Sequence, residues 1–86
     1  MNPQPAYWTV ERRRSVVHHL IHLREEGVDL RRAIESLHHG VPEDARMLQD
    51  APETWEWLEA RHWITFVVDR DRRWILVTDI ESAAIE

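Results

Sequence analysis

The apolar residues of the first forty positions recur at the spacing of an amphipathic helix. Val16, Leu20 and Leu23 fall on one helical face within a helix predicted over 9–26. The threonine that opens this segment is a good N-cap residue, and Gly27 is a typical helix stop. We expect this face to form part of the core, so that Leu20→Ala costs about 2–5 kcal/mol.

A second apolar stripe follows after a short polar break. Asp29 is placed to cap a helix, and Ile34 and Leu37 lie on one face of it. Gly40 is expected to end this helix. The first half of the chain is therefore predicted to contain two helices.

The segment 42–62 carries the signals of a further helical region. Its two prolines each stand beside acidic residues, as in a first helical turn, and Pro52 permits either one kinked helix or two. On a helix, Trp55 and Leu58 would point inward, whereas Trp57 would point away from Trp55 by about 160°. We therefore expect Trp55 and Leu58 in the core and Trp57 at the surface.

The pattern changes after His62. The segments 63–68 and 74–78 are rich in β-branched and aromatic residues, and 69–73 is a charged connector of hairpin length. An antiparallel β-hairpin is predicted, in which Trp63 and Trp74 pair across the strands. The fold class expected from these patterns is α+β.

This order of elements is that of a winged helix-turn-helix domain: three to four helices followed by an antiparallel hairpin, the wing. Residues 12–85 resemble the small winged-helix proteins of Mu-like bacteriophages and prophages, through RRSVVHHLIHL, LRRAIESLHHGV, TWEWLEARHWI and WILVTD. The resemblance implies a winged-helix-like domain over 9–86 behind an N-terminal arm at 1–8. A final helical turn is expected at 80–85.

Composition excludes several classes of protein. The chain has 86 residues, which suit one domain, and no cysteine, so neither disulfides nor thiolate chemistry are expected. No apolar run approaches the ~20 residues of a membrane span, and the first residues lack the pattern of a secretory signal. Two glycines leave no phosphate-cradling loop, and no nucleophile motif is present. We expect a soluble cytoplasmic protein that is neither an enzyme nor a cofactor binder.

The winged-helix resemblance implies DNA binding by a phage or prophage transcriptional regulator. Wing and first-helix arginines would contact phosphates, and two residues of the segment 42–62 would read bases. The candidate DNA-binding residues are Arg12, Arg13, Arg14, Arg46, Gln49, Arg70, Arg72 and Arg73. The charge opposes this function, because the net charge of the chain is −5 and DNA-contacting faces are usually basic.

Charge favours a second hypothesis, in which an acidic winged-helix module docks onto a basic, nucleic-acid-binding partner and can inhibit it. Residues 1–40 hold six arginines and five acids, whereas 41–86 hold five arginines and eleven acids. The candidate protein-binding residues are Glu43, Asp44, Glu53, Glu56, Trp57 and Glu59. An exposed Trp8 or Trp57 would also suit a homodimer, since aromatic residues are enriched at interfaces.

The histidines raise a metal hypothesis. His18 and His22 are four residues apart on the first predicted helix, a spacing at which two imidazoles can reach one Zn²⁺. No third ligand is fixed near them in the sequence. We therefore expect surface histidines and no metal site.

Overall fold

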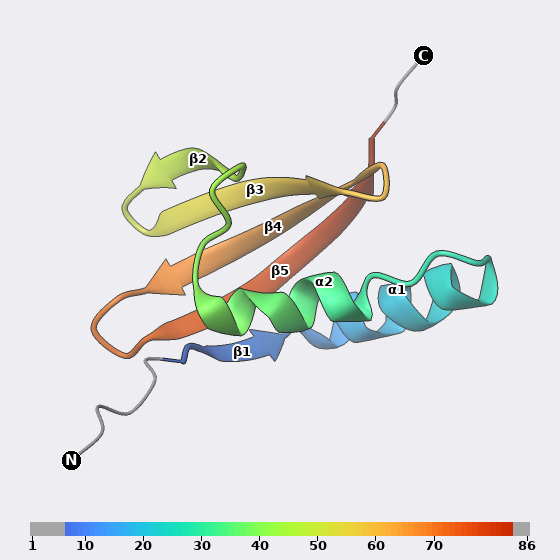
Figure 1. Ribbon diagram of the computed structural model, residues 1–86, viewed down its shortest axis with the longest axis horizontal. Helices are drawn as coiled ribbons and strands as arrows, with labels where there is room; N and C mark the ends of the chain where they lie inside the picture. The colour runs from blue at the N-terminus through green and yellow to red at the C-terminus, as the bar shows by residue number, and fades with distance from the viewer. Residues whose placement is uncertain (1–6, 84–86) are drawn as a thin grey trace.

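The computed structural model describes residues 7–83, and it shows a five-stranded sheet with both helices on one side (Figure 1). Short connections join its five strands and two α-helices. In chain order the elements are β1 (Thr9–Arg12), α1 (Arg14–Glu25), α2 (Arg31–Glu35), the 3₁₀ helix η1 (Ser36–His39), β2 (Arg46–Asp50), β3 (Glu53–Glu59), β4 (His62–Asp69) and β5 (Trp74–Ser82).

The sheet has the strand order β1-β5-β4-β3-β2. Strands β2 to β5 form an antiparallel meander, in which each strand pairs with the next along the chain. Strand β1 closes the other edge by pairing in parallel with β5, so that Val10 lies opposite Ile75. Two parallel strands need a long connection between them along the chain. Here that connection contains the helices and strands β2, β3 and β4.

The core lies between the sheet and the helices. Along β4 the even-numbered side chains face inward and are buried, while the odd-numbered ones are only half-buried. Register places Phe66 opposite Trp55 of β3 and Val77 of β5, so these three side chains share the inner face. The buried core consists of Val16, Leu20, Leu23, Leu30, Ile34, Leu37, Trp57, Ile64, Phe66, Val68, Ile75, Val77 and Ile80.

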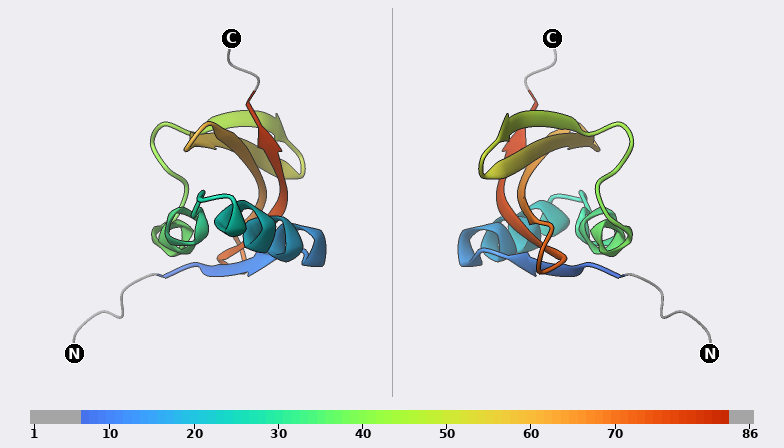
Figure 2. Two further views of the ribbon diagram at one scale, coloured as in Figure 1. Left: turned by 90° about the vertical axis from the view of Figure 1, so that its right-hand side faces the viewer. Right: turned by 90° about the vertical axis from the view of Figure 1, so that its left-hand side faces the viewer.

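Glycine ends the helical layer at Gly40, where the backbone has a φ of 108°. A side chain is disfavoured here both by the positive φ and by space, because a Cβ atom would lie 3.2 Å from Nε1 of Trp8. The backbone N–H of Trp8 in turn donates to the carbonyl of His38 at 2.8 Å. The end of η1 is thereby fixed against the residue that leads into β1. Figure 2 shows the helices lying inside the curve of the sheet.

The winged-helix architecture predicted from the sequence is wrong. The segment 42–62 forms a loop and strands β2 and β3 instead of a third and fourth helix. Residues 9–12 form β1 rather than a first helical turn, and Ile80 to Ser82 belong to β5 rather than to a final turn. Pairing between strands accounts for these segments, because β1 gains its backbone partners from β5, far away in the sequence, and β3 gains its partners from β2 and β4.

Other predictions are confirmed. The segments 63–68 and 74–78 pair as antiparallel strands, and the core residues predicted on the first two helices are buried: Val16, Leu20, Leu23, Ile34 and Leu37. Of the two core residues predicted on 42–62, Trp55 packs half-buried against the core, whereas the prediction for Leu58 is wrong, because its side chain is 39% exposed. Within the hairpin, however, Trp63 lies opposite Glu81 and Trp74 opposite Asp69, so the two tryptophans do not pair. The predicted arm at 1–8 lies mostly outside the described residues.

Candidate protein-interaction surfaces

The structure separates the arginines that were predicted to contact DNA. Arg46 and Gln49 lie on β2 and Arg12 lies on β1, and these two strands form opposite edges of the sheet. Arg13 and Arg14 follow at the start of α1. Arg70, Arg72 and Arg73 lie on the turn between β4 and β5. No element brings all eight side chains to one face.

Three of these arginines are held in ion pairs. Arg46 pairs with Glu56 across the β2–β3 ladder. Arg72 Nε lies 3.8 Å from Oδ2 of Asp69 within the hairpin turn. Arg70 pairs with Glu53 of the neighbouring hairpin, 2.7 Å from Nη2 to Oε2. Each pair lowers the positive charge that these arginines present to a phosphate backbone.

The Glu53 ion pair ties the β2–β3 and β4–β5 hairpins together. Arg70 donates from Nε to Oε1 and from Nη2 to Oε2 of Glu53, both at 2.7 Å, in the bidentate geometry of an arginine–carboxylate pair. Trp55 Nε1 donates a third hydrogen bond to the same carboxylate at 2.7 Å. The hydrogen bond from Arg70 lowers the pKa of Glu53, and the hydrogen bond to Glu53 raises the pKa of Arg70.

We expect Glu53→Gln to reduce the loss of unfolding free energy that accompanies a fall in pH. Because the folded state lowers the pKa of Glu53, its ion pair stabilises the protein at neutral pH, and this contribution is lost as pH falls below about 4.5. The variant should be less stable than the parent at pH 7, and the difference should narrow toward pH 3. Urea denaturation at several pH values measures this. Glu43→Gln is the control, since Glu43 makes no ion pair within residues 7–83, and an equal narrowing there would contradict the assignment.

The predicted acidic surface does not form as one patch. Glu53 and Glu59 lie on the inner side of β3, whereas Glu56 lies on the outer side. Asp44 accepts a hydrogen bond from Trp57 Nε1 at 3.0 Å, and Glu43 is exposed in the loop before β2. The prediction that Trp57 is exposed is wrong, because its side chain is only 6% exposed and belongs to the core.

The two histidines proposed as metal ligands lie on the surface of α1. His18 and His22 are exposed on α1, and His22 Nε2 lies 3.8 Å from Oε1 of Glu26. Within the described residues, no group of three or more histidine, aspartate or glutamate side chains is placed to hold a metal ion.

The side of the sheet away from the helices carries a set of apolar residues. This set was not found from the sequence, because helices were predicted over 42–62. We call this side the outer sheet face. Cross-strand neighbours on it include Leu58 with Trp63 and Val67 with Leu76. Trp74 extends the set next to β1, where it lies opposite Thr9. No element within residues 7–83 covers these five side chains, and the alternation of buried and half-buried residues along β4 and the first half of β5 places four of them on one side of the sheet.

Carboxylates lie among the apolar residues of the outer sheet face. Glu11 lies opposite Leu76, and Glu81 lies opposite Trp63. A register shift in β5 places Asp79 opposite Thr65, on the same side of the sheet. Glu56 completes the acidic set, and the Arg46 guanidinium lies 5.7 Å from the centre of the Trp63 ring. The outer sheet face is therefore apolar and acidic.

A groove with different chemistry lies on the helical layer. We call it the helix groove; its volume is about 560 Å³, and it is lined by Arg12, Val17, Leu20, Ile21, Arg24, Glu25, Arg31 and Glu35. The side chains of Val17 and Ile21 are 39% and 55% exposed, although both are large and apolar. They occupy the face of α1 next to the buried stripe of Val16, Leu20 and Leu23 that the sequence predicted.

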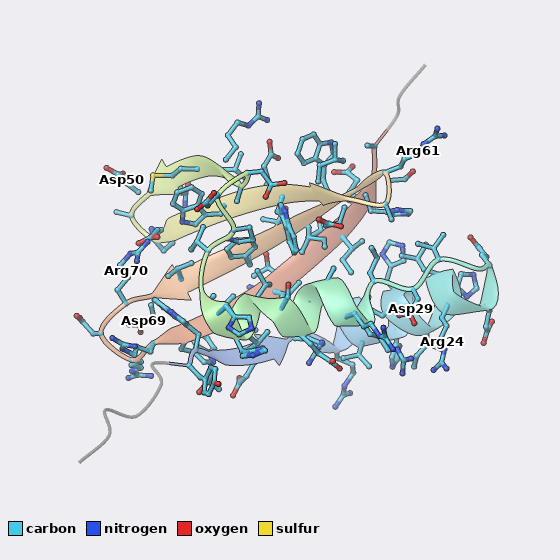
Figure 3. All side chains as sticks on the ribbon, in the orientation of Figure 1. Arg24, Asp29, Asp50, Arg61, Asp69 and Arg70 are labelled. Atoms are coloured by element: carbon cyan, nitrogen blue, oxygen red, sulfur yellow. The ribbon has the colours of Figure 1, made fainter. Side chains whose placement is uncertain are left out.

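Arginines stand at both ends of the helix groove. Arg12 lies at the end of β1, and Arg24 lies near the end of α1 beside Arg31 of α2. Figure 3 shows Arg24 and Asp29 at the loop that joins the helices. Arg31 donates to Asp29 from Nε at 3.3 Å, which lowers the pKa of Asp29. Arg12 and Arg24 make no ion pair within residues 7–83.

Comparison with known proteins adds no relative. No protein-family model, curated protein or solved structure matches the chain. None of the helices in the described part of the chain is long and apolar enough to cross a membrane.

Proposed function

We propose that this protein is a protein-binding module whose outer sheet face docks onto a basic segment of a partner. The observation that carries the proposal is the set of five apolar side chains on that face, of which Leu58 is exposed and the other four are half-buried, with carboxylates placed among them. The proposed partner segment contains lysine or arginine together with apolar residues. It would bury the tryptophans and pair its cations with the carboxylates.

Burial and charge both support this proposal. An antiparallel sheet commonly has one solvated face, and that face is then mostly polar. Here Trp63 and Trp74 lie on it, and aromatic residues are enriched where proteins bind one another. Contiguous exposed apolar surface is characteristic of an interaction site. The carboxylates would steer a basic partner to this face and orient it.

DNA binding has less support from the geometry and stays a prediction. Arg46, Arg70 and Arg72 are already paired with carboxylates. The outer sheet face would repel phosphates, because four acids lie on it and the two arginines beside it, Arg46 and Arg72, are each paired with a carboxylate. The predicted recognition segment lies on strands, and its base-reading candidates are on the exposed edge strand β2.

A titration with a defined basic peptide tests the proposal. The probe is an extended peptide of about ten residues in which lysine and valine alternate, long enough to span ~33 Å along a strand. The readout is the set of indole N–H signals in a ¹⁵N–¹H spectrum. The signals of Trp63 and Trp74 should move, while those of Trp55 and Trp57 should stay, since their N–H groups are bonded to Glu53 and Asp44.

Matched variants separate a docking surface from general charge attraction. Glu81→Lys should weaken binding by about five- to tenfold, because Glu81 lies opposite Trp63, whereas Glu26→Lys on the helical layer should change it little. A peptide with serine in place of valine should bind more weakly. The proposal fails if about 1 mM peptide moves neither outer indole signal, or if the two glutamate variants weaken binding equally.

The same spectrum also tests DNA binding. Mixed-sequence duplex should leave the spectrum unchanged at ~100 μM protein in low salt. Binding that disappears when Arg70, Arg72 and Arg73 are replaced together by alanine would overturn the protein-binding proposal in favour of DNA.

A further inference from the structure

The helix groove is a second surface with its own partner chemistry. We propose that it binds an amphipathic helix of a partner protein that carries acidic residues near both of its ends. This proposal does not depend on the outer sheet face, because residues of α1 and α2 line the groove. These helices lie on the other side of the sheet (Figure 2). It rests on the shape, the apolar floor and the charges of the groove.

The floor of the groove has the spacing of a helix-binding surface. Val17 and Ile21 are one turn apart on α1 and exposed, and Leu20 lies between them at the edge of the core. A surface helix normally turns such residues inward and keeps polar residues outside. A partner helix would pack its own apolar residues, three and four positions apart, against this stripe.

The charges determine what lies beside the apolar contact. Arg12 precedes α1 and Arg24 lies near its end, so the two cations are separated by roughly the 18 Å length of a twelve-residue helix. Glu35 of α2 also lines the groove and disfavours acidic residues in the middle of the partner, whereas Glu25, the last residue of α1, stands beside Arg24 at one end and partly offsets its charge there. A helix with carboxylates near both ends and apolar residues between them is therefore the complementary ligand.

Charge also distinguishes this groove from the rest of the protein. From Thr9 to Glu35 the chain carries six arginines and five acids, whereas from Glu43 to Glu81 it carries five arginines and ten acids. An acidic partner would therefore meet repulsion from the sheet and its hairpins and attraction at the helical layer. The same distribution directs the basic segment of the preceding proposal to the opposite side.

The test uses a designed peptide and the full chain. The probe is a fluorescein-labelled helical peptide of about 14 residues, ~21 Å long, with leucines at positions three and four apart, glutamates near both ends and alanines elsewhere. Fluorescence polarisation at low salt should show saturable binding, with a Kd on the order of 10–100 μM. A peptide with lysine in place of each glutamate should bind at least about tenfold more weakly.

Exposed residues elsewhere supply the controls. Ile21→Asp should weaken binding about tenfold or more, whereas Leu48→Asp, at a residue with a comparable exposed fraction of 48% on β2, should leave it unchanged. Arg24→Glu should lower the affinity for the peptide and make it less dependent on salt. Arg61→Glu, at the β3–β4 turn, should change neither the affinity nor its salt dependence; Figure 3 labels both arginines. These substitutions lie at exposed positions, and circular dichroism checks that each variant keeps its fold.

Three results would overturn the proposal. The first is absence of binding at about 1 mM protein. The second is binding that Ile21→Asp and Leu48→Asp weaken equally. The third is self-association of the free protein that Ile21→Asp abolishes, measured by sedimentation, because the groove would then be occupied by a second copy of this chain. Binding of the lysine–valine peptide at the outer sheet face is measured separately, so either proposal can fail alone.

Discussion

Replacing Phe66 by alanine is expected to lower the free energy of unfolding by about 3–5 kcal/mol. Phe66 is fully buried on the central strand β4, with Trp55 and Val77 as its neighbours across the ladder. A domain of this length has a total stability of roughly 4–13 kcal/mol. Loss of the ring would therefore remove a large part of the stability, because the strands on both sides keep a cavity from closing.

Urea denaturation measures this loss. Val67→Ala is the matched control, since Val67 is the next residue on β4 and lies on the half-buried outer sheet face; its loss should be about 1 kcal/mol or less. If Phe66→Ala does not fold, Phe66→Leu keeps most of the side-chain volume and should show an intermediate loss. A loss below about 1 kcal/mol for Phe66→Ala would show that the sheet does not pack on this residue.

The helices and the last hairpin were predictable because their signals are local. The stripe of Val16, Leu20 and Leu23 has helical spacing, and Gly27 and Gly40 mark the ends of the helical segments with positive φ angles. Strand β4 alternates buried and half-buried residues along its whole length. Each of these elements contains its own periodicity, so the sequence alone sufficed to locate them.

Strand β1 could not be predicted in the same way. Residues 9–12 are too few to show a period, and they directly precede the helix. Their strand conformation depends on pairing with 74–77, at the other end of the chain. A threonine at the start of an amphipathic segment is also a common N-cap residue, so local signals favoured the helix. Tertiary pairing overrode them.

The candidate surfaces likewise depended on whether a signal is local in the sequence or comes from pairing between distant segments. A helix through 42–62 gathers Glu53, Glu56 and Glu59 on one side, whereas β3 divides them between the two faces of the sheet. The charge asymmetry between the two halves of the chain was visible in the sequence. The alternation within β4 was visible too, but the assembly of the outer sheet face was not, because it comes from cross-strand neighbours such as Val67 and Leu76. The helix groove likewise needs α1 and α2 side by side.

The second large effect is expected at Trp57, where the helical and strand interpretations predict opposite results. On β3 the side chain of Trp57 is 6% exposed, and its Nε1 donates to Asp44 at 3.0 Å. Trp57→Ala should therefore cost about 3–5 kcal/mol, as for other buried aromatic residues. The adjacent Leu58 is 39% exposed on the outer sheet face, so Leu58→Ala should cost about 1 kcal/mol or less.

A helix through this segment would reverse the order, with Leu58 in the core and Trp57 in water. Urea denaturation of the two single variants, side by side with the parent, decides between these interpretations without any ligand. Trp57→Phe adds a further check, because it keeps an aromatic ring but removes the donor to Asp44; its loss should fall between those of the two alanine variants. A larger loss for Leu58→Ala than for Trp57→Ala would overturn β3, and with it the outer sheet face on which the proposed function depends.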